Sequence, residues 1–211
     1  MKYVLFDVAG TLLYKPSFYV KMEEVLRQFG YAVDPKTLKY HHKILSESIF
    51  FPDRTNADFY SHFNRELLYS LGILPTDEML DTIFSSCSYL PWEKFDDTAF
   101  LNQINVPIGI ISNFNSTLKE KLKSFFDVEF SDIFVSEELG VAKPSLEFYG
   151  KALEKIGIEA SEIIYIGDSV KLDLEPALKL GMKAMLIDRD DYFPLQQNRI
   201  RTLTDLKQWL P

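Results

Sequence analysis

The stretch Tyr3-Val4-Leu5-Phe6-Asp7-Val8-Ala9-Gly10-Thr11-Leu12-Leu13 decides the fold of this 211-residue chain. Its four successive apolar residues, Tyr3 to Phe6, show no alternation and predict a strand that is buried on both faces, as in a parallel sheet. Ligand-binding crevices of open α/β sheets lie at the carboxyl ends of the strands. Asp7 stands at that end, and Gly10 and Thr11 follow it. The segment therefore predicts an active-site turn in which Asp7 is a nucleophile or a metal ligand.

The composition limits the class of protein. With 46% hydrophobic residues, the chain can bury one core, or one core and a smaller satellite. A formal net charge of −8 provides no basic surface, so neither a nucleic acid nor a membrane is expected as a partner. The run Tyr3–Phe6 is too short for a signal-peptide core, and no apolar run approaches the ~18 residues of a membrane span. With a single cysteine, Cys87, these features favour a cytoplasmic protein that binds a small molecule. The oligomeric state is left open.

Helical patterns follow the first strand. Apolar residues recur there at helical spacing, and the first helix is expected to bury Val20. The sequence Phe50-Phe51-Pro52-Asp53 predicts a break after the second helix. Four capping or first-turn residues mark the expected starts of the helices: Pro16, Asp34, Asn56 and Thr76. The segment 14–90 is therefore predicted to be an α-helical insert.

From Pro91 onward, strand and helix patterns alternate. Strands that are separated by helices imply right-handed crossovers and a parallel sheet. The predicted strands cover residues 106–112, 131–136, 163–166 and 182–187. The sequence thus predicts an α/β fold with a three-layer, Rossmann-like parallel-sheet core. That core is expected to consist of residues 1–13 and 91–211, and residues 14–90 are expected to form a helical cap domain.

Polar side chains gather at the ends of the predicted strands and at a nearby loop. Parallel strands present their carboxyl ends at one edge of the sheet, so groups that are distant in sequence can meet there. Carboxylates with a lysine make a site for a hard cation such as Mg²⁺, which can bridge protein oxygens to a phosphate. Neither a G-x-G-x-x-G motif after the first strand nor a P-loop is present, which argues against a dinucleotide-binding fold and a P-loop enzyme. The converging residues are Asp7, Ser112, Asn113, Lys143, Asp168 and Asp173.

Four segments, in this order, resemble the four motifs of the haloacid dehalogenase-like (HAD) hydrolase superfamily. They are Asp7–Leu13, Ile111–Asn113, Lys143–Pro144, and Gly167–Ser169 with Asp173. The resemblance covers nearly the whole chain. The helical insert is similar to the cap domain that many members carry directly after the first motif.

This resemblance implies a Mg²⁺-dependent phosphatase that acts on a small phosphorylated metabolite. Asp7 would attack phosphorus and form an aspartyl-phosphate, and Lys143 would neutralise charge on the nucleophile and the phosphate. Mg²⁺ would be held by the Asp7 carboxylate, the Ala9 carbonyl oxygen and Asp168, with Asp173 acting directly or through water. The residues implied to bind the substrate are Gly10, Thr11, Ser112, Asn113 and Lys143.

Ala9 departs from the pattern of the family. Its phosphatases usually carry a second aspartate two residues after the nucleophile, which protonates the leaving alcohol and then activates water. A positioned general acid–base group is worth roughly 10²–10⁴ in rate. One hypothesis is a phosphatase for acyl or aryl phosphates, or one that recruits a cap residue or water as the acid. A second is a C–P bond hydrolase similar to the phosphonoacetaldehyde hydrolases, with Lys39 or Lys43 as the Schiff-base lysine. A third is a protein that binds a phosphate compound or a partner with weak or no turnover.

Overall fold

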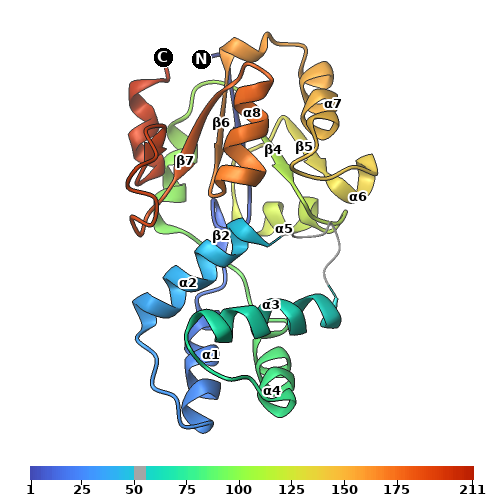
Figure 1. Cartoon of the computed structure of the whole chain (residues 1–211). Coiled ribbons are helices and arrows are strands. Elements are labelled where there is room, and N and C mark those ends of the chain that lie inside the picture. Colours follow the sequence, from blue (N-terminus) through green and yellow to red (C-terminus); the bar gives the residue numbers. More distant parts are fainter. Residues whose placement is uncertain (50–55) are drawn as a thin grey trace. The chain divides into compact units, whose positions relative to one another are not determined.

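The computed structural model describes residues 1–49 and 56–211, and within them the chain forms two compact units (Figure 1). The larger unit consists of Met1–Tyr14 and Lys94–Pro211, and the smaller unit consists of Lys15–Glu93. The interpretation of the helical segment as a cap domain stays a prediction. The predicted break at Phe50–Asp53 lies outside the described residues.

The larger unit is built on a six-stranded sheet with the order β5-β4-β1-β6-β7-β8, in which every described pair of strands is parallel. The strands are β1 (Tyr3–Phe6), β4 (Ile108–Ser112), β5 (Asp132–Val135), β6 (Ile163–Gly167), β7 (Lys183–Ile187) and β8 (Arg199–Ile200). β1 lies inside the sheet, because Val4 is in register with Ile108 on one side and with Ile164 on the other. The predicted α/β parallel-sheet class is therefore confirmed.

Both faces of this sheet are covered, which explains why the strand sequences are continuously apolar. On one face, Leu5 and Tyr165 share a buried cluster with residues of α7 (Leu146–Ile156) and α8 (Glu175–Lys179). Side chains alternate along a strand, so Phe6 points to the opposite face, where it is also completely buried. Helices thus flank the sheet in a layered arrangement. The remaining elements of this unit are β2 (Leu13–Tyr14), 3₁₀ helix η1 (Asp96–Gln103), α5 (Leu118–Phe125), α6 (Ser136–Leu139), η2 (Ala160–Glu162), π-helical turn η3 (Val170–Leu174) and 3₁₀ helix η4 (Leu203–Gln208). The short strand β3 (Glu93–Lys94), at the boundary of the two units, pairs with β2.

Apart from Glu93 of β3, the regular elements of the smaller unit within its described residues are α-helices. Three helices begin at side-chain caps that the sequence predicted, because an oxygen of Asp34, Asn56 and Thr76 accepts a hydrogen bond from the backbone N–H three residues on. The helices of the described part are α1 (Ser17–Gln28), α2 (Pro35–Ser48), α3 (Ala57–Ser70) and α4 (Asp77–Cys87). None of the helices in residues 1–49 and 56–211 has the length and hydrophobicity to cross a membrane.

The expectation for Val20 is wrong, since this side chain is 54% exposed. The buried face of α1 is set by Met22, Val25 and Leu26, which follow the spacing of three and four residues. Val20 lies two positions before Met22, which is about half a turn around the helix. It therefore faces away from the core of the unit.

Candidate active site

Asp7 lies at the carboxyl end of β1, and only 4% of its surface is exposed. Its backbone N–H donates to the carbonyl of Ile166 at 2.8 Å, which extends the pairing of β1 with β6 by one residue. Lys143 Nζ donates to Asp7 Oδ1 at 2.6 Å, and the Thr11 hydroxyl donates to Oδ2 at 3.4 Å. The sheet thus holds the backbone of Asp7, and each of its two carboxylate oxygens accepts a hydrogen bond.

Gly10 brings the turn after Asp7 against Asp168. Its φ of +84° is a left-handed conformation that side chains disfavour. A Cβ atom at this position would also overlap the carboxylate of Asp168. Only glycine adopts this φ without strain and also leaves room for the Asp168 carboxylate. Gly10 therefore allows the turn to approach Asp168 closely.

Lys143 joins the nucleophile candidate to a second carboxylate. Its buried ammonium group lies 2.6 Å from Asp7 Oδ1 and 2.7 Å from Asp173 Oδ1. The main chain of Lys143 is held by Asn113, whose Oδ1 accepts from Lys143 N at 2.7 Å and whose Nδ2 donates to Lys143 O at 3.1 Å. Asn113 was predicted as a substrate contact, and in this structure its side chain positions the lysine.

Asp173 reaches the site through a π-helical turn. The N–H of Leu174 donates to Ser169 O at 3.1 Å, five residues back, which widens the turn and brings Asp173 over Gly167. A Cβ atom on Gly167 would overlap the Asp173 side chain. Asp173 Oδ2 accepts from Ser169 N at 3.0 Å, so Asp173 also braces the segment that follows Asp168.

Tyr165 is a member of this polar network that the sequence did not reveal. It lies in the apolar strand β6, where a tyrosine normally belongs to the hydrophobic core. Its hydroxyl nevertheless donates to Asp173 Oδ1 at 2.8 Å and lies 3.5 Å from Lys143 Nζ. Burial, followed by the charge of Asp173, raises the pKa of Tyr165 well above 10, so the hydroxyl remains a donor.

Ser112 and Ala9 complete the predicted set. Ser112 ends β4 and is buried. Phe6 is in register with Ile110, so Ser112 lies two residues further along, at the same sheet edge as Asp7. Ala9 is exposed, and it forms an isolated bridge with Leu13.

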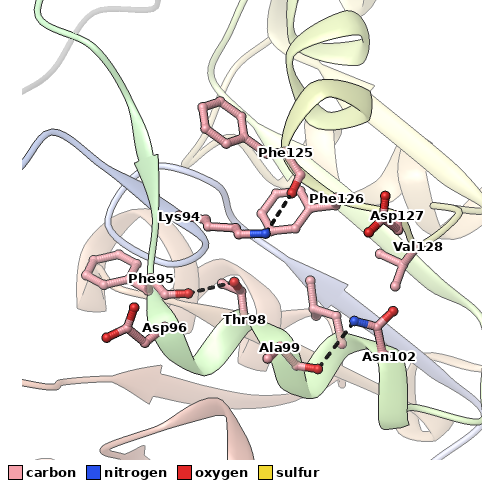
Figure 2. Close-up of a pocket in the computed structure, with 11 residues that line it drawn as sticks. Lys94, Phe95, Asp96, Thr98, Ala99, Asn102, Phe125, Phe126, Asp127 and Val128 are labelled. Atoms are coloured by element: carbon pink, nitrogen blue, oxygen red, sulfur yellow. Dashed lines mark hydrogen bonds between the residues drawn. The ribbon is translucent and has the colours of Figure 1, made fainter.

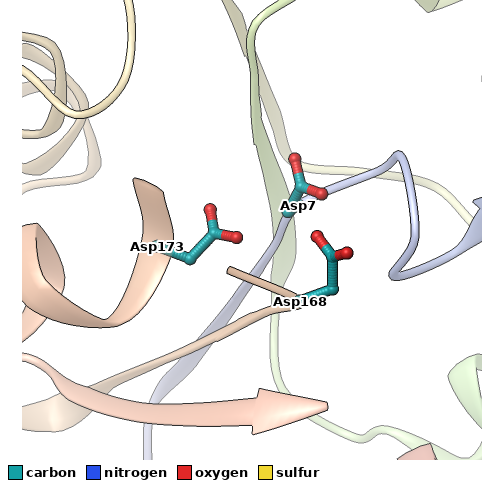
Figure 3. Close-up of side chains that lie close together, drawn as sticks. All are labelled: Asp7, Asp168 and Asp173. Atoms are coloured by element: carbon teal, nitrogen blue, oxygen red, sulfur yellow. The ribbon is translucent and has the colours of Figure 1, made fainter. Parts of the chain in front are cut away.

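Three carboxylates meet at this edge of the sheet (Figure 3). Asp7, Asp168 and Asp173 each offer an oxygen, and these oxygens lie within 4.8 Å of one another. Lys143 is paired with two of these carboxylates, those of Asp7 and Asp173. Carboxylate oxygens are ligands that Mg²⁺ prefers, so the residues present fit this ion.

Burial raises the pKa of Asp7 to about 7, and the charges of Asp173 and Asp168 add to the shift while Lys143 opposes it. Burial by itself lowers the pKa of Lys143, but the charges of Asp173 and Asp7 outweigh it and the net shift is upward. The lysine is therefore charged at neutral pH. A bound cation favours the ionised form of Asp7, which is the nucleophilic one.

A pocket of about 240 Å³ lies elsewhere in the larger unit, between η1 and the residues around the end of α5 (Figure 2). Lys94 reaches across it and donates to the Phe125 carbonyl at 3.3 Å. No predicted site residue is among the described residues that line this pocket.

The sequence model of the haloacid dehalogenase-like hydrolase family matches residues 1–181. The chain therefore belongs to this family. Its match to glyceraldehyde 3-phosphate phosphatase of Methanocaldococcus jannaschii is 34% identical over 121 residues and covers 50% of this chain and 51% of the relative. The phosphatase of the same name from Methanothermobacter thermautotrophicus is 26% identical over 210 residues, covering 90% of this chain and 87% of the relative. This chain thus spans about half the length of the first relative.

Solved structures share the fold. A HAD phosphatase from Thermococcus onnurineus superimposes with a TM-score of 0.58 at 22% identity, covering 99% of this chain and 97% of the other. The HAD-type protein YfnB of Bacillus subtilis, solved with magnesium bound, gives a TM-score of 0.66 at 21% identity and covers 99% and 98% of the two chains. At these identities the likeness concerns the fold alone.

Proposed function

We propose that this protein is a Mg²⁺-dependent phosphatase that acts on a small phosphorylated metabolite through an aspartyl-phosphate on Asp7. The observation that carries the proposal is the buried contact of Asp7 with Lys143, 2.6 Å long, beside the carboxylates of Asp168 and Asp173. The relatives named glyceraldehyde 3-phosphate phosphatase support a phosphorylated substrate.

In the first step, a carboxylate oxygen of Asp7 attacks phosphorus, and the bond to the leaving oxygen breaks with its electron pair remaining on that oxygen. In the second step, water attacks the phosphorus of the acyl phosphate and releases inorganic phosphate and the Asp7 carboxylate. Such transfer depends mainly on positioning and charge neutralisation. Lys143 supplies a fixed positive charge next to Asp7, and Ser112 with the backbone N–H groups near it holds phosphoryl oxygens.

The carboxylates of Asp7 and Asp168 and the carbonyl oxygen of Ala9 would hold Mg²⁺. When bound, the ion acts as a Lewis acid that offsets charge on the phosphoryl oxygens. Asp173 is already engaged by Lys143, Tyr165 and Ser169. We assign Asp173 to positioning Lys143 and the segment after Asp168, with any effect on the ion passing through these groups or through water.

Ala9 limits the range of substrates that we expect the protein to hydrolyse. A methyl group cannot protonate a leaving alkoxide, so substrates with good leaving groups, such as acyl and aryl phosphates, are favoured over alkyl phosphates. The methyl group leaves the proposed metal contact in place, since that contact uses the Ala9 backbone carbonyl.

The test is a panel of acyl, aryl and alkyl phosphates, assayed with Mg²⁺ and with a chelator. We expect Mg²⁺-dependent release of phosphate, fastest for acyl and aryl substrates, and loss of turnover in Asp7→Asn. Asp190→Asn, which alters an exposed carboxylate outside the cluster, is the matched control and should retain full activity. No turnover of any substrate, or equal turnover in Asp7→Asn, would contradict the proposal. Ligand-induced stabilisation without product would favour a binding protein instead.

The C–P hydrolase alternative requires a neutral lysine that attacks a carbonyl group. The ammonium of Lys43 lies 3.4 Å from a carboxylate oxygen of Glu47. Lys39 lies over the ring of Tyr19, at 5.6 Å from its centre. An ion pair and a cation–π contact are both interactions of ammonium groups, so these two contacts give the alternative no support.

A further inference from the structure

Arg189 holds the main chain of the turn that follows Asp7. Its Nη1 donates to the Gly10 carbonyl at 3.2 Å, and its Nη2 donates to the Thr11 carbonyl at 2.9 Å. Arg189 follows β7, so it reaches the turn from a different part of the sheet. Two adjacent peptide groups next to the nucleophile are thus tied to one side chain.

The guanidinium group is itself fixed by Asp97 in η1. Arg189 Nε donates to Asp97 Oδ2 at 3.1 Å and Nη2 donates to Oδ1 at 2.8 Å, which makes the ion pair bidentate. Asp97 Oδ2 also accepts from the backbone N–H of Leu203 at 3.0 Å. The side chains of Arg189 and Asp97 are 19% and 15% exposed, so water competes only weakly for these bonds.

An aromatic ring packs against the flat face of the Arg189 guanidinium group. The central carbon of the Arg189 guanidinium lies 3.8 Å from the centre of the Phe95 ring. Phe95 in turn stacks on Tyr14, with ring centres 4.3 Å apart and planes inclined by 15°. Phe95 precedes η1, where its carbonyl accepts from the Thr98 hydroxyl at 2.6 Å (Figure 2). A lysine has neither the planar face nor the fork that this environment requires.

We propose that Arg189 is a positioning residue for phosphoryl transfer, because it fixes the peptide groups of Gly10 and Thr11 relative to Asp7. Those peptides orient the Thr11 hydroxyl toward Asp7, and they follow directly after the Ala9 carbonyl in the turn. The inference rests on the proposed function for its effect on rate. Displacement of a reacting group by about 1 Å costs on the order of 10²-fold in rate.

The experiment compares Arg189→Ala and Arg189→Lys with a control, Arg201→Ala. Arg201 lies in the same unit and pairs with Asp191 at 2.6 Å, but its side chain is 56% exposed and outside the cluster. In Arg189→Ala we expect kcat to fall roughly 10- to 100-fold with little change in KM. Arg189→Lys should behave like the alanine variant, and Arg201→Ala should match the wild type. Low millimolar guanidinium chloride should restore part of the kcat of Arg189→Ala, because the free ion can occupy the place between Asp97 and the turn.

Hydrogen exchange followed by mass spectrometry gives a second readout that needs no substrate. Amides of residues 8–13 should exchange faster in Arg189→Ala than in Arg201→Ala, while peptides of β6 and β7 exchange alike. Equal exchange of residues 8–13 in the two variants, or a kcat loss that guanidinium does not reduce, would overturn the inference. If Arg189→Ala fails to fold, the hydrogen exchange of residues 8–13 is measured in Arg189→Lys and Asp97→Asn instead, and the result is judged in the same way. Absence of any turnover in the wild type would defeat the proposed function alone, since the exchange result would still decide the role of Arg189.

Discussion

At the scale of single residues, Gly10 and Gly181 form a natural pair for comparison. Both have a φ of +84°, so an added Cβ strains the backbone equally. At Gly10 the Cβ would overlap Asp168, whereas at Gly181 it would be in ordinary van der Waals contact with Ala160 Cβ, 3.9 Å away. We expect both alanine variants to lose about 1–2 kcal/mol of unfolding free energy from the left-handed conformation. We expect Gly10→Ala alone to lose Mg²⁺-dependent turnover as well.

Urea unfolding and a phosphate-release assay on the two variants check this prediction. A Gly10→Ala enzyme with the same activity as Gly181→Ala would show that the close approach of Gly10 to Asp168 has no part in the reaction.

Ala9 supplies the second residue-scale prediction. Ala9→Asp places a carboxyl group two residues after Asp7, and it should raise kcat for alkyl phosphates more than kcat for aryl phosphates, because only the poor leaving group needs a proton. A positioned acid–base group gives about 10²–10⁴ in rate, which is the upper range of the gain. The measurement is the ratio of the two kcat values in wild type and variant. An unchanged ratio would count against this account of Ala9.

The placement of several residues at the candidate site could be predicted from sequence, and the placement of others could not. Asp7, Lys143 and Asp168 stand at strand ends or loop junctions, where a polar side chain has no packing task, so they are conspicuous in the sequence. Tyr165 is not conspicuous, because a tyrosine in a buried strand matches the core pattern and its hydroxyl partner is set by tertiary structure. Asn113 was among the predicted site residues, but its hydrogen bonds to the Lys143 main chain depend on a loop 30 residues away.

At the scale of elements, caps and apolar runs were the most informative signals. The starts of α2, α3 and α4 follow from local hydrogen bonds that a short sequence specifies. Short elements escaped prediction. β8 has two residues and exists through its pairing with β7, and η1 is a 3₁₀ helix whose residues lack the apolar period of an α-helix.

Helix α2 carries a pH-dependent prediction through His42. This partly buried imidazole lies edge-on to Phe63 at 5.2 Å, and its Nδ1 is 3.3 Å from the Tyr19 hydroxyl. Burial, with a smaller effect of Lys43, lowers the pKa of His42 from 6.5 to about 4. Between these values the unfolded chain is protonated at His42 and the folded chain is not. The histidine therefore contributes stability above pH 6.5 that is lost as the pH falls toward 4.

Urea unfolding of the wild type and of His42→Gln over this pH range tests the prediction. The variant should show a weaker decrease of unfolding free energy with acidification. His62→Gln, which changes an exposed histidine of α3, is the control and should keep the wild-type dependence. Equal slopes for wild type and His42→Gln would refute the assignment.

At the scale of the whole molecule, metal binding is expected to couple to folding, because the carboxylates come together only in the folded sheet. Mg²⁺ at about 100 times its Kd should add ~2.7 kcal/mol to the unfolding free energy. Thermal unfolding with Mg²⁺ and with EDTA measures the effect. Asp168→Asn should reduce the shift strongly, whereas Asp190→Asn should preserve it. A wild type that melts at the same temperature under both conditions would contradict a Mg²⁺ site.

The convergence of the motifs at one sheet edge was predictable, since parallel strands require it. The contacts between distant loops were not. Arg189 and Asp97 are 92 residues apart, and neither lies in a motif whose spacing indicates their pairing. Sequence patterns therefore predicted the groups proposed for the chemistry, while the supports that hold them became apparent only from the packed structure.

The interior position of β1 has a consequence for the order of folding. The sheet divides into β5-β4 on one side and β6-β7-β8 on the other, each made of strands near in sequence, and β1 alone connects them. β1 has no local partner, since Val4 pairs with Ile108 and Ile164, and such long-range pairing is slow to form. Its insertion joins the two halves and places Asp7 beside Lys143 and Asp168 in the same event. Recovery of activity during refolding should therefore coincide with the last step of sheet assembly rather than with the appearance of helical structure.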